Sequence, residues 1–364
     1  MSDDTEKPTG TGEEEISEPE AEVEKPVEEE SKDKRKITLK NPFGFIFNVR
    51  MLRRVVQILF FLGINAYILV AWNIFTPWNA SLAHIWNSVA SFWLQIWLQI
   101  QSVLPSFPIL ASLEGPYSVI AGSFDTIQRT FTTGQFPFFT LGAMIIILIF
   151  IGRAPCGWVC PIGTIQDFVT LPKRNKVRPA PNTETDLRKM KVYIFFIVAF
   201  LAVWVGFAAF TGTQDAITTA LGIFANDAFA PLNPAYILFV ALTQVDWPTS
   251  IGTLWYISLW GFVLLQVAFV VFIFLVSIWV PRWFCRWICP AGWLYGVFSR
   301  EALIGIGRNP ARCTPDTCNV CEVACPMNIR IRKYPYQHMH SPDCIMCLDC
   351  KSKCPNDAIV LRFS

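Results

Sequence analysis

The sequence predicts an α-helical membrane protein with four transmembrane helices, followed by a small α+β domain at the C-terminal end. Three observations support this. Four stretches long enough to cross a bilayer carry no charge, Lys and Arg gather in alternate connections, and eight of the 12 cysteines fall in the last 52 residues. The 364 residues are 53% hydrophobic, with a mean hydropathy of +0.39, whereas soluble proteins contain about 45–50% apolar residues.

Residues 1–40 are expected to be a disordered acidic tail in the cytoplasm. The first 30 residues hold 13 Asp and Glu against two Lys, so this segment has too few apolar side chains to bury a core. It also lacks the basic start and apolar stretch of a cleaved signal peptide.

Residues 41–300 are predicted to form the membrane domain, because its apolar stretches approach the roughly 20 residues needed to cross a bilayer. Eight Lys and Arg fall in residues 32–54, eight in 153–191 and eleven in 281–364, whereas residues 76–132 hold only Arg129 and 213–253 hold none. This asymmetry predicts a multi-pass protein of the inner (cytoplasmic) membrane with both termini in the cytoplasm. The predicted helices are about 55–75, 133–152, 192–212 and 254–280.

The two connections that are poor in basic residues are long and apolar. Residues 81–104 are expected to form an amphipathic interfacial helix, and 105–122 and 231–243 to form short interfacial or re-entrant pieces. Two interpretations stay open: these pieces pack at the membrane surface, or they line a quinol pocket. Because the spanning segments contain no acidic or basic residue, they predict no proton path.

Two similar octets follow the second and fourth predicted helices. They read CGWVCPIG from Cys156 and CRWICPAG from Cys285, and an Arg precedes each first Cys by three residues. This repetition indicates a parallel duplication of a helical hairpin. Cysteines four residues apart are expected on one helix face, and the two pairs should reach the same membrane depth. The four thiols are a candidate third redox or metal site, with two separate thiol pairs as the alternative: Cys156, Cys160, Cys285 and Cys289.

Residues 301–364 contain two cysteine runs that each end in Cys-Pro. The second run has the x2, x2, x3 spacing of bacterial ferredoxins, and the first has two extra residues after its first cysteine. In such α+β ferredoxin-like domains each of two [4Fe–4S] clusters takes three cysteines of one run and one of the other. The spacing disfavours the alternatives, structural zinc and disulfides. The expected ligands are Cys313, Cys318, Cys321 and Cys354 for the first cluster and Cys344, Cys347, Cys350 and Cys325 for the second, with a closing strand at 359–361.

The sequence lacks the motifs that bind several classes of cofactor and substrate. None of the three histidines lies in a predicted spanning helix, and no C-x-x-C-H motif occurs, which excludes bis-His and c-type haem. No phosphate-binding loop occurs, and no nucleic-acid partner is expected.

On its octets and cysteine runs, the chain from about residue 45 to 364 resembles the NapH/NosR/CcoG group of polytopic membrane ferredoxins. The resemblance implies electron transfer between the quinone pool or cytoplasmic donors and an extracytoplasmic redox system. NapH-like members are quinol dehydrogenase subunits, NosR-like members support nitrous oxide reductase, and CcoG-like members handle copper. An acidic tail stands where NosR-like members have a flavin-binding domain, and the chain ends nine residues after Pro355, so the NapH type is the nearest expectation.

Three functions remain open at this stage. The first is a quinol dehydrogenase-like electron-transfer subunit of an oxidoreductase, with membrane lipid, quinone and a redox protein as partners. The second is a maturation, metal-reducing or regulatory protein, and the third is a membrane anchor with structural clusters. Gln166 and Asp167 are expected at a solvated helix start rather than at a quinone headgroup. The basic residues of 173–191 are expected to follow the positive-inside rule, with docking of an acidic partner as the alternative.

Overall fold

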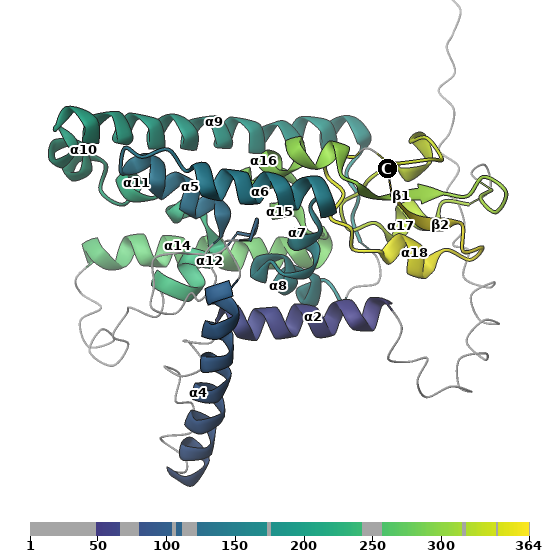
Figure 1. The fold of residues 1–364 in the computed structure, drawn as a ribbon, viewed down its shortest axis with the longest axis horizontal. Helices are drawn as coiled ribbons and strands as arrows, with labels where there is room; N and C mark the ends of the chain where they lie inside the picture. Colours follow the sequence, from purple (N-terminus) through teal and green to yellow (C-terminus); the bar gives the residue numbers. More distant parts are fainter. Residues whose placement is uncertain are drawn as a thin grey trace, which may run out of the picture. The chain divides into compact units, whose positions relative to one another are not determined.

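The computed structural model describes residues 49–65, 80–103, 107–110, 122–172, 176–241, 257–314, 318–339 and 341–363. Helices dominate the described part of the chain (Figure 1). Those of ten or more residues are α2 (Val49–Ile64), α4 (Ala80–Val103), α5 (Ser123–Thr132), α6 (Phe138–Ile151), α9 (Pro181–Thr211) and α14 (Ile257–Trp279), and the shorter α10 (Gln214–Leu221) follows α9. The acidic tail and the second half of the first predicted transmembrane helix lie outside the described residues.

One helix in the described ranges is long and apolar enough to cross a membrane: α9, with 31 residues, which contains all but the last residue of the predicted span 192–212. The predicted span 133–152 corresponds to α6, whose 14 residues reach about 21 Å at 1.5 Å per residue, less than the hydrocarbon thickness of about 30 Å. The predicted span 254–280 corresponds to α14, with 23 residues. The four-helix topology therefore stays a prediction.

Helix α9 separates its side chains into two faces. Large apolar side chains point outward, as with Phe200 and Phe207, while Val198, Ala202 and Val205 are buried. This division follows from the 3.6-residue period of an α-helix. Small residues on the inner face let α5 approach closely: a Cβ on Gly206 would lie 2.1 Å from the carbonyl oxygen of Phe131.

The two long connections enter the interior of the helical domain. The first forms the expected helix at 81–104, observed as α4, and then α5, which packs along α9. The second forms α11 (Ile223–Asn226), η2 (Ala230–Leu232), α12 (Pro234–Tyr236) and η3 (Ile237–Ala241). Ile109 and Ala235, together with Phe124 and Phe229 beside these pieces, are buried in the main core. The described residues 107–110 and 231–241 therefore pack against the helices, whereas most of the predicted piece 105–122 lies outside the described residues.

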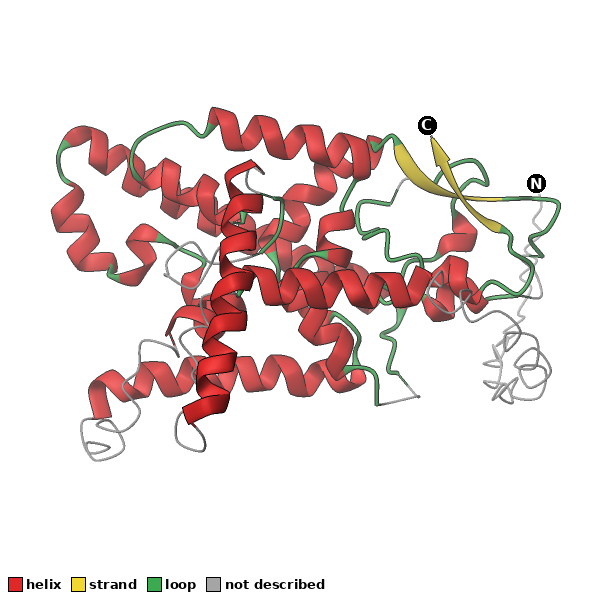
Figure 2. Ribbon diagram, turned by 60° about the horizontal axis from the view of Figure 1, so that its bottom comes forward, coloured by secondary structure: helices red, strands yellow, loops and turns green. Residues whose placement is uncertain are grey.

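The C-terminal part contains the two strands that the described residues form, coloured yellow in Figure 2. Strand β1 (Ile304–Arg308) pairs antiparallel with β2 (Ile359–Phe363), with Ile306 opposite Leu361. The expected closing strand at 359–361 is therefore confirmed. Two short helices, α17 (Val320–Ala324) and α18 (Asp349–Lys353), carry one cysteine each and contact one another.

Candidate functional site

Each octet folds into the same short helix, turn and second helix. Cys156 lies in α7 (Ala154–Trp158) and Cys285 in α15 (Trp283–Trp287), whereas the second cysteine of each octet caps the helix that follows, α8 (Pro161–Val169) or α16 (Pro290–Phe298). The expectation that both cysteines share one helix face is wrong. The following Pro forces the second cysteine into an extended conformation, with φ −60° and ψ 122° at Cys160.

The four octet cysteines line one cavity with about 390 Å³ of empty space. Cys160 and Cys289 are 6% exposed, and the cavity wall is otherwise largely apolar. No three His, Cys, Asp or Glu side chains in the described ranges stand close enough to hold a single metal ion. The shared cavity favours one site that both octets build over two separate thiol pairs. Its remaining lining residues are Leu110, Arg153, Ile162, Arg282, Ala291, Gly292, Tyr295 and Ile345.

Two fully buried arginines border this cavity, and each lies beside the octet that it does not precede in the sequence. A Cβ on Gly163 of the first octet would lie 3.3 Å from the guanidinium of Arg282, and a Cβ on Gly292 of the second would lie 2.9 Å from that of Arg153. Each arginine therefore occupies the space beside the glycine of the other octet. Because buried charges need compensation, two guanidinium groups suit a centre held by four thiolates.

The second cysteine of each octet also lies beside the backbone of the helix that follows. Burial raises the pKa of Cys160 and of Cys289, and the backbone of Gly163 and of Gly292, respectively, opposes this shift. The Gln166 amide nitrogen lies 3.4 Å from the sulfur of Cys285. Burial raises the pKa of the Cys285 thiol to about 11, although Arg282 opposes this shift. Thiolate ligands in this cavity therefore need a bound cation or cluster in addition to the arginines.

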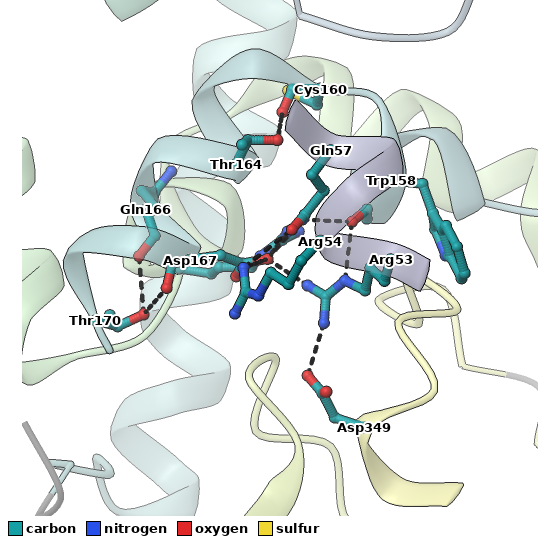
Figure 3. Close-up of polar contacts among 12 residues, drawn as sticks. Arg53, Arg54, Gln57, Trp158, Cys160, Thr164, Gln166, Asp167, Thr170 and Asp349 are labelled. Carbon is teal, nitrogen blue, oxygen red and sulfur yellow. Dashed lines mark hydrogen bonds and ion pairs between the residues drawn. The ribbon is translucent and has the colours of Figure 1, made fainter. Parts of the chain in front are cut away.

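Asp167 joins three segments around the first octet (Figure 3). Arg282 donates to both carboxylate oxygens at 2.7 Å, Gln57 donates at 2.9 Å, and Arg53 forms a further ion pair. Burial alone would raise the pKa of Asp167, but Arg282 and Arg53 hold it well below its usual value. The expectation of a solvated helix start is wrong: Gln166 is 0% and Asp167 6% exposed, because these ion pairs compensate the buried charge.

The second cysteine set predicted for the C-terminal domain surrounds another cavity, with about 300 Å³ of empty space and an apolar wall. The cavity is lined by the last cysteine of the first run, Cys325, and by three cysteines of the second run, Cys344, Cys347 and Cys350. In the other set, burial raises the pKa of Cys321 to about 11, and the nearby thiols of Cys318 and Cys313 raise it too. The backbone N–H of Ala358 donates to the sulfur of Cys354 at 3.2 Å.

One side chain, Ile345, lines both the octet cavity and the C-terminal cavity. The first octet lies directly against this part of the chain, since the Trp158 indole N–H donates to the carbonyl of Met346 at 2.9 Å. A Cβ on Gly157 would lie 2.4 Å from the Ile345 carbonyl oxygen. The two cysteine-lined cavities are therefore immediate neighbours.

Two carboxylates of the C-terminal domain bind arginines of the helical domain. Asp343, which precedes the ligand candidate Cys344, pairs with Lys191 at 2.6 Å, Arg188 at 2.8 Å and Arg153 at 3.3 Å. Asp349 pairs with Arg53 at 2.7 Å. Arg188 and Lys191 therefore make specific contacts within the chain, and their part in the positive-inside rule stays a prediction. No sequence motif marked Asp343 or Asp349, although each stands within the second cysteine run or directly before it.

Sequence reasoning also missed two acidic residues in the interior of the helical domain. Asp125 in α5 is 1% exposed and Asp227, between α11 and η2, is 2% exposed. Both belong to connections that the sequence places outside the spanning segments. The sequence feature that could have marked them is their position in long stretches that otherwise carry few charges.

Comparisons with known proteins agree with this geometry. Residues 133–179 and 254–308 match Fer4_5, a family described as a 4Fe-4S binding domain. Each matched range contains one octet, and neither reaches the cysteine runs from Cys313 onward. No solved structure matches the chain.

Three relatives share about a quarter of their aligned residues with the chain. The uncharacterized protein MJ0750 of Methanocaldococcus jannaschii is 25% identical over 62% of this chain and 78% of its own length. YccM of Escherichia coli, provisionally named an electron transport protein, is 25% identical over 75% of this chain and 70% of its own. The regulatory protein NosR of Stutzerimonas stutzeri is 23% identical over 55% of this chain, which spans 24% of NosR.

These comparisons support a distant relationship to iron–sulfur electron-transport and regulatory proteins, and both octet segments are similar to a 4Fe-4S binding domain.

Proposed function

We propose that this chain is a membrane-bound electron-transfer protein in which three iron–sulfur centres form one conduit. Two [4Fe–4S] clusters occupy the cysteine sets of the C-terminal domain, and a third centre occupies the octet cavity. The main support for this proposal is that Ile345 lines both the octet cavity and the cavity of the second set. An electron that reaches this second set then has a single residue between it and the octet centre.

The residues of the octet cavity fit a cluster. Four cysteines line it, two buried arginines border it, and the backbone at the start of the following helix lies beside the second cysteine of each octet. A cluster held by these four cysteines would supply one-electron chemistry. The chain's own residues hold the cluster's charge away from water and fix the distance to the neighbouring site.

Iron content and electron paramagnetic resonance of the anaerobically purified full chain test the proposal. We expect about 12 iron atoms per chain, four for each cluster. Cys156→Ser or Cys285→Ser should remove one spectroscopic signal and leave those of the C-terminal domain. The reciprocal control, Cys347→Ser, should remove a C-terminal signal and leave the octet signal. About eight irons in the unmodified protein, or a complete set of signals in Cys285→Ser, contradicts the third centre.

The protein is proposed to lie in the inner membrane with both termini in the cytoplasm and to take electrons from quinol. The outward faces of α6, α9 and α14 support a membrane location, since each exposes several Phe, Leu or Val side chains. A cavity with about 690 Å³ of empty space supports quinol binding, because it borders both Gly292 of the second octet and Asp343. It is otherwise lined by Arg188, Lys191, Trp293, Gly296, Val297, Arg300 and Pro342.

A bulky side chain in this cavity tests quinol binding. Val297 lines the cavity and is 48% exposed, so Val297→Trp should prevent reduction of the clusters by quinol in liposomes while dithionite still reduces them. Val203→Trp on the outward face of α9, where Val203 is 56% exposed, is the matched control and should behave as the unmodified protein. Equal rates of cluster reduction by quinol in both variants exclude this cavity.

The second candidate function is maturation or regulation of a metalloenzyme, which the similarity to the regulatory protein NosR favours. In this function the clusters reduce a metal ion, such as Cu(II), or the thiols of a partner protein. Reduction of Cu(II) by the pre-reduced protein, lost in Cys156→Ser, supports this candidate over electron transfer from quinol.

A further inference from the structure

Two buried carboxyl groups lie in the interior of the helical domain, on segments that the electron conduit does not use. Asp125 belongs to α5, and Asp227 follows α11. Neither oxygen of Asp125 has a hydrogen-bond partner among the described residues. A carboxylate at such a position is costly unless it is paired, so an acidic residue in this interior requires a functional explanation.

The surroundings of the pair contain further polar atoms without partners. Gln128, one helical turn after Asp125, is 3% exposed and lies beside Asp227, yet neither of its amide atoms reaches hydrogen-bond geometry with a described residue. Asp125, Asp227 and Gln128 form a polar interior site.

A short polar connection joins this site to the octet cavity. Tyr295 is fully buried and lines the cavity, and its hydroxyl lies 2.9 Å from that of Ser123, the first residue of α5. Asp125 and the octet thiols of Cys156 and Cys289 all lie close enough to Tyr295 to influence its hydroxyl. Tyr295 therefore stands within electrostatic reach of both the octet thiols and Asp125.

The charges around the pair set which carboxyl group holds a proton. Burial raises the pKa of both groups, and the charge of Asp227 raises that of Asp125 further. Asp227 is the better anion, because the backbone N–H of Phe229 donates to its carboxylate at 3.2 Å and Arg129 lies nearby. Tyr236 of α12 and Tyr295 of α16 are the other titratable groups beside the pair. The part of α9 that packs on α5, around Gly206, is apolar.

We propose that Asp125 and Asp227 form a redox-linked proton site, in which the carboxyl group of Asp125 binds one proton when the octet centre is reduced and releases it when the centre is oxidised. This inference rests on the third centre proposed above. In the oxidation step the octet centre gives one electron to the one-electron acceptor of the conduit. The O–H bond of Asp125 breaks, and its proton passes to water. Reduction reverses both changes, so the site keeps its total charge.

The test follows the midpoint potential of the octet centre in the full chain as pH varies, monitored by its paramagnetic signal. In the unmodified protein we expect a shift of about 59 mV for each tenfold change in proton concentration, the value for one proton per electron. Asp125→Asn should make the potential independent of pH, and Asp125→Glu should restore the dependence. Asp215→Asn, an exposed acidic residue of α10, is the matched control and should keep it.

Infrared spectroscopy provides a readout that does not depend on electron transfer. A protonated carboxyl band should appear as pH is lowered at constant redox state, and it should be absent in Asp125→Asn but present in Asp215→Asn. An octet signal whose potential ignores pH in the unmodified protein overturns this inference and leaves the electron conduit intact. Absence of any octet signal overturns both. Retained C-terminal signals in Asp125→Asn show that the variant is folded.

Discussion

Asp167 and Arg282 show how single residues position the octet site. The pair is bidentate, and both side chains are buried, at 6% and 1% exposure. Arg282 is thereby held beside Gly163 and the carbonyl of Cys156, to which it donates at 3.0 Å. Loss of the carboxylate leaves a buried guanidinium uncompensated, which is the costly way to break a buried pair.

We therefore expect Asp167→Asn to lower the free energy of unfolding by about 3–5 kcal/mol at neutral pH. Because Arg282 and Arg53 hold the pKa of Asp167 below its usual value, and the unfolded group titrates near pH ~3.9, the folded state binds fewer protons in acid. The contribution of Asp167 to the free energy of unfolding is therefore complete above about pH 4 and is lost as pH falls further.

Denaturant unfolding of the detergent-solubilised protein at several pH values measures this effect. The unmodified protein should lose stability below about pH 4, and Asp167→Asn should lack that part of the acid dependence. Asp186→Asn, at an exposed position of α9, is the control and should change stability by less than about 0.5 kcal/mol. Equal stability of the two variants at pH 7 contradicts this account of Asp167.

At the scale of elements, the close contact between the first octet and residues 345–346 sets the separation of the two cavities. Gly157 permits this contact because it has no Cβ. The same contact depends on α2, where Arg53 and Gln57 donate to the Gly157 carbonyl at 3.2 and 2.9 Å. A methyl group at Gly157 has to displace the backbone of Ile345.

Gly157→Ala should therefore slow electron transfer between the second C-terminal cluster and the octet centre while both clusters are retained. Pulsed reduction followed by rapid-freeze spectroscopy measures this rate. Gly142→Ala in α6 is the matched control, because no atom lies within 4 Å of the added Cβ and Ala is favoured over Gly in a helix by about 1 kcal/mol. Unchanged transfer in Gly157→Ala means that the contact does not set the separation.

Several elements could be predicted from the sequence, but their interior arrangement could not. Hydrophobic length predicted α9, and cysteine spacing predicted which thiols should meet. The partners of Asp167 could not be predicted, because Arg53 and Arg282 lie far from it in the sequence and only the folded helices bring them together. Asp125 looked like a residue of an outer connection, since its burial depends on α5 packing along α9.

At the scale of the whole molecule, the C-terminal domain is held to the helices through buried charges. Asp343 and Asp349 both flank cysteine positions and bind basic residues of α9 and α2 and, just before the first octet, Arg153. These contacts fix the domain relative to the octet cavity, and an electron conduit requires this fixed geometry.

Asp349→Asn should loosen this attachment by about 1–3 kcal/mol, because Arg53 loses one of its charged partners. Hydrogen exchange of the amides in α18 and of those around Gly157 should accelerate together. Asp357→Asn, an exposed acidic position of the same domain with positive φ that Asn tolerates, is the control. Identical exchange in the two variants contradicts a role for Asp349 in attachment.

Arg282 lies beside the first octet and Arg153 beside the second. The octet cavity therefore assembles only when both halves of the chain have been synthesised. Cys156 precedes Cys285 by 129 residues, so at 5–20 residues per second the first octet waits on the order of 10 s for the second. During that interval Cys156 and Cys160 have neither Arg282 nor their two partner thiols. We therefore expect the proposed octet centre to be loaded only after the second half has left the ribosome, and the nascent first pair to be exposed to oxidants until then.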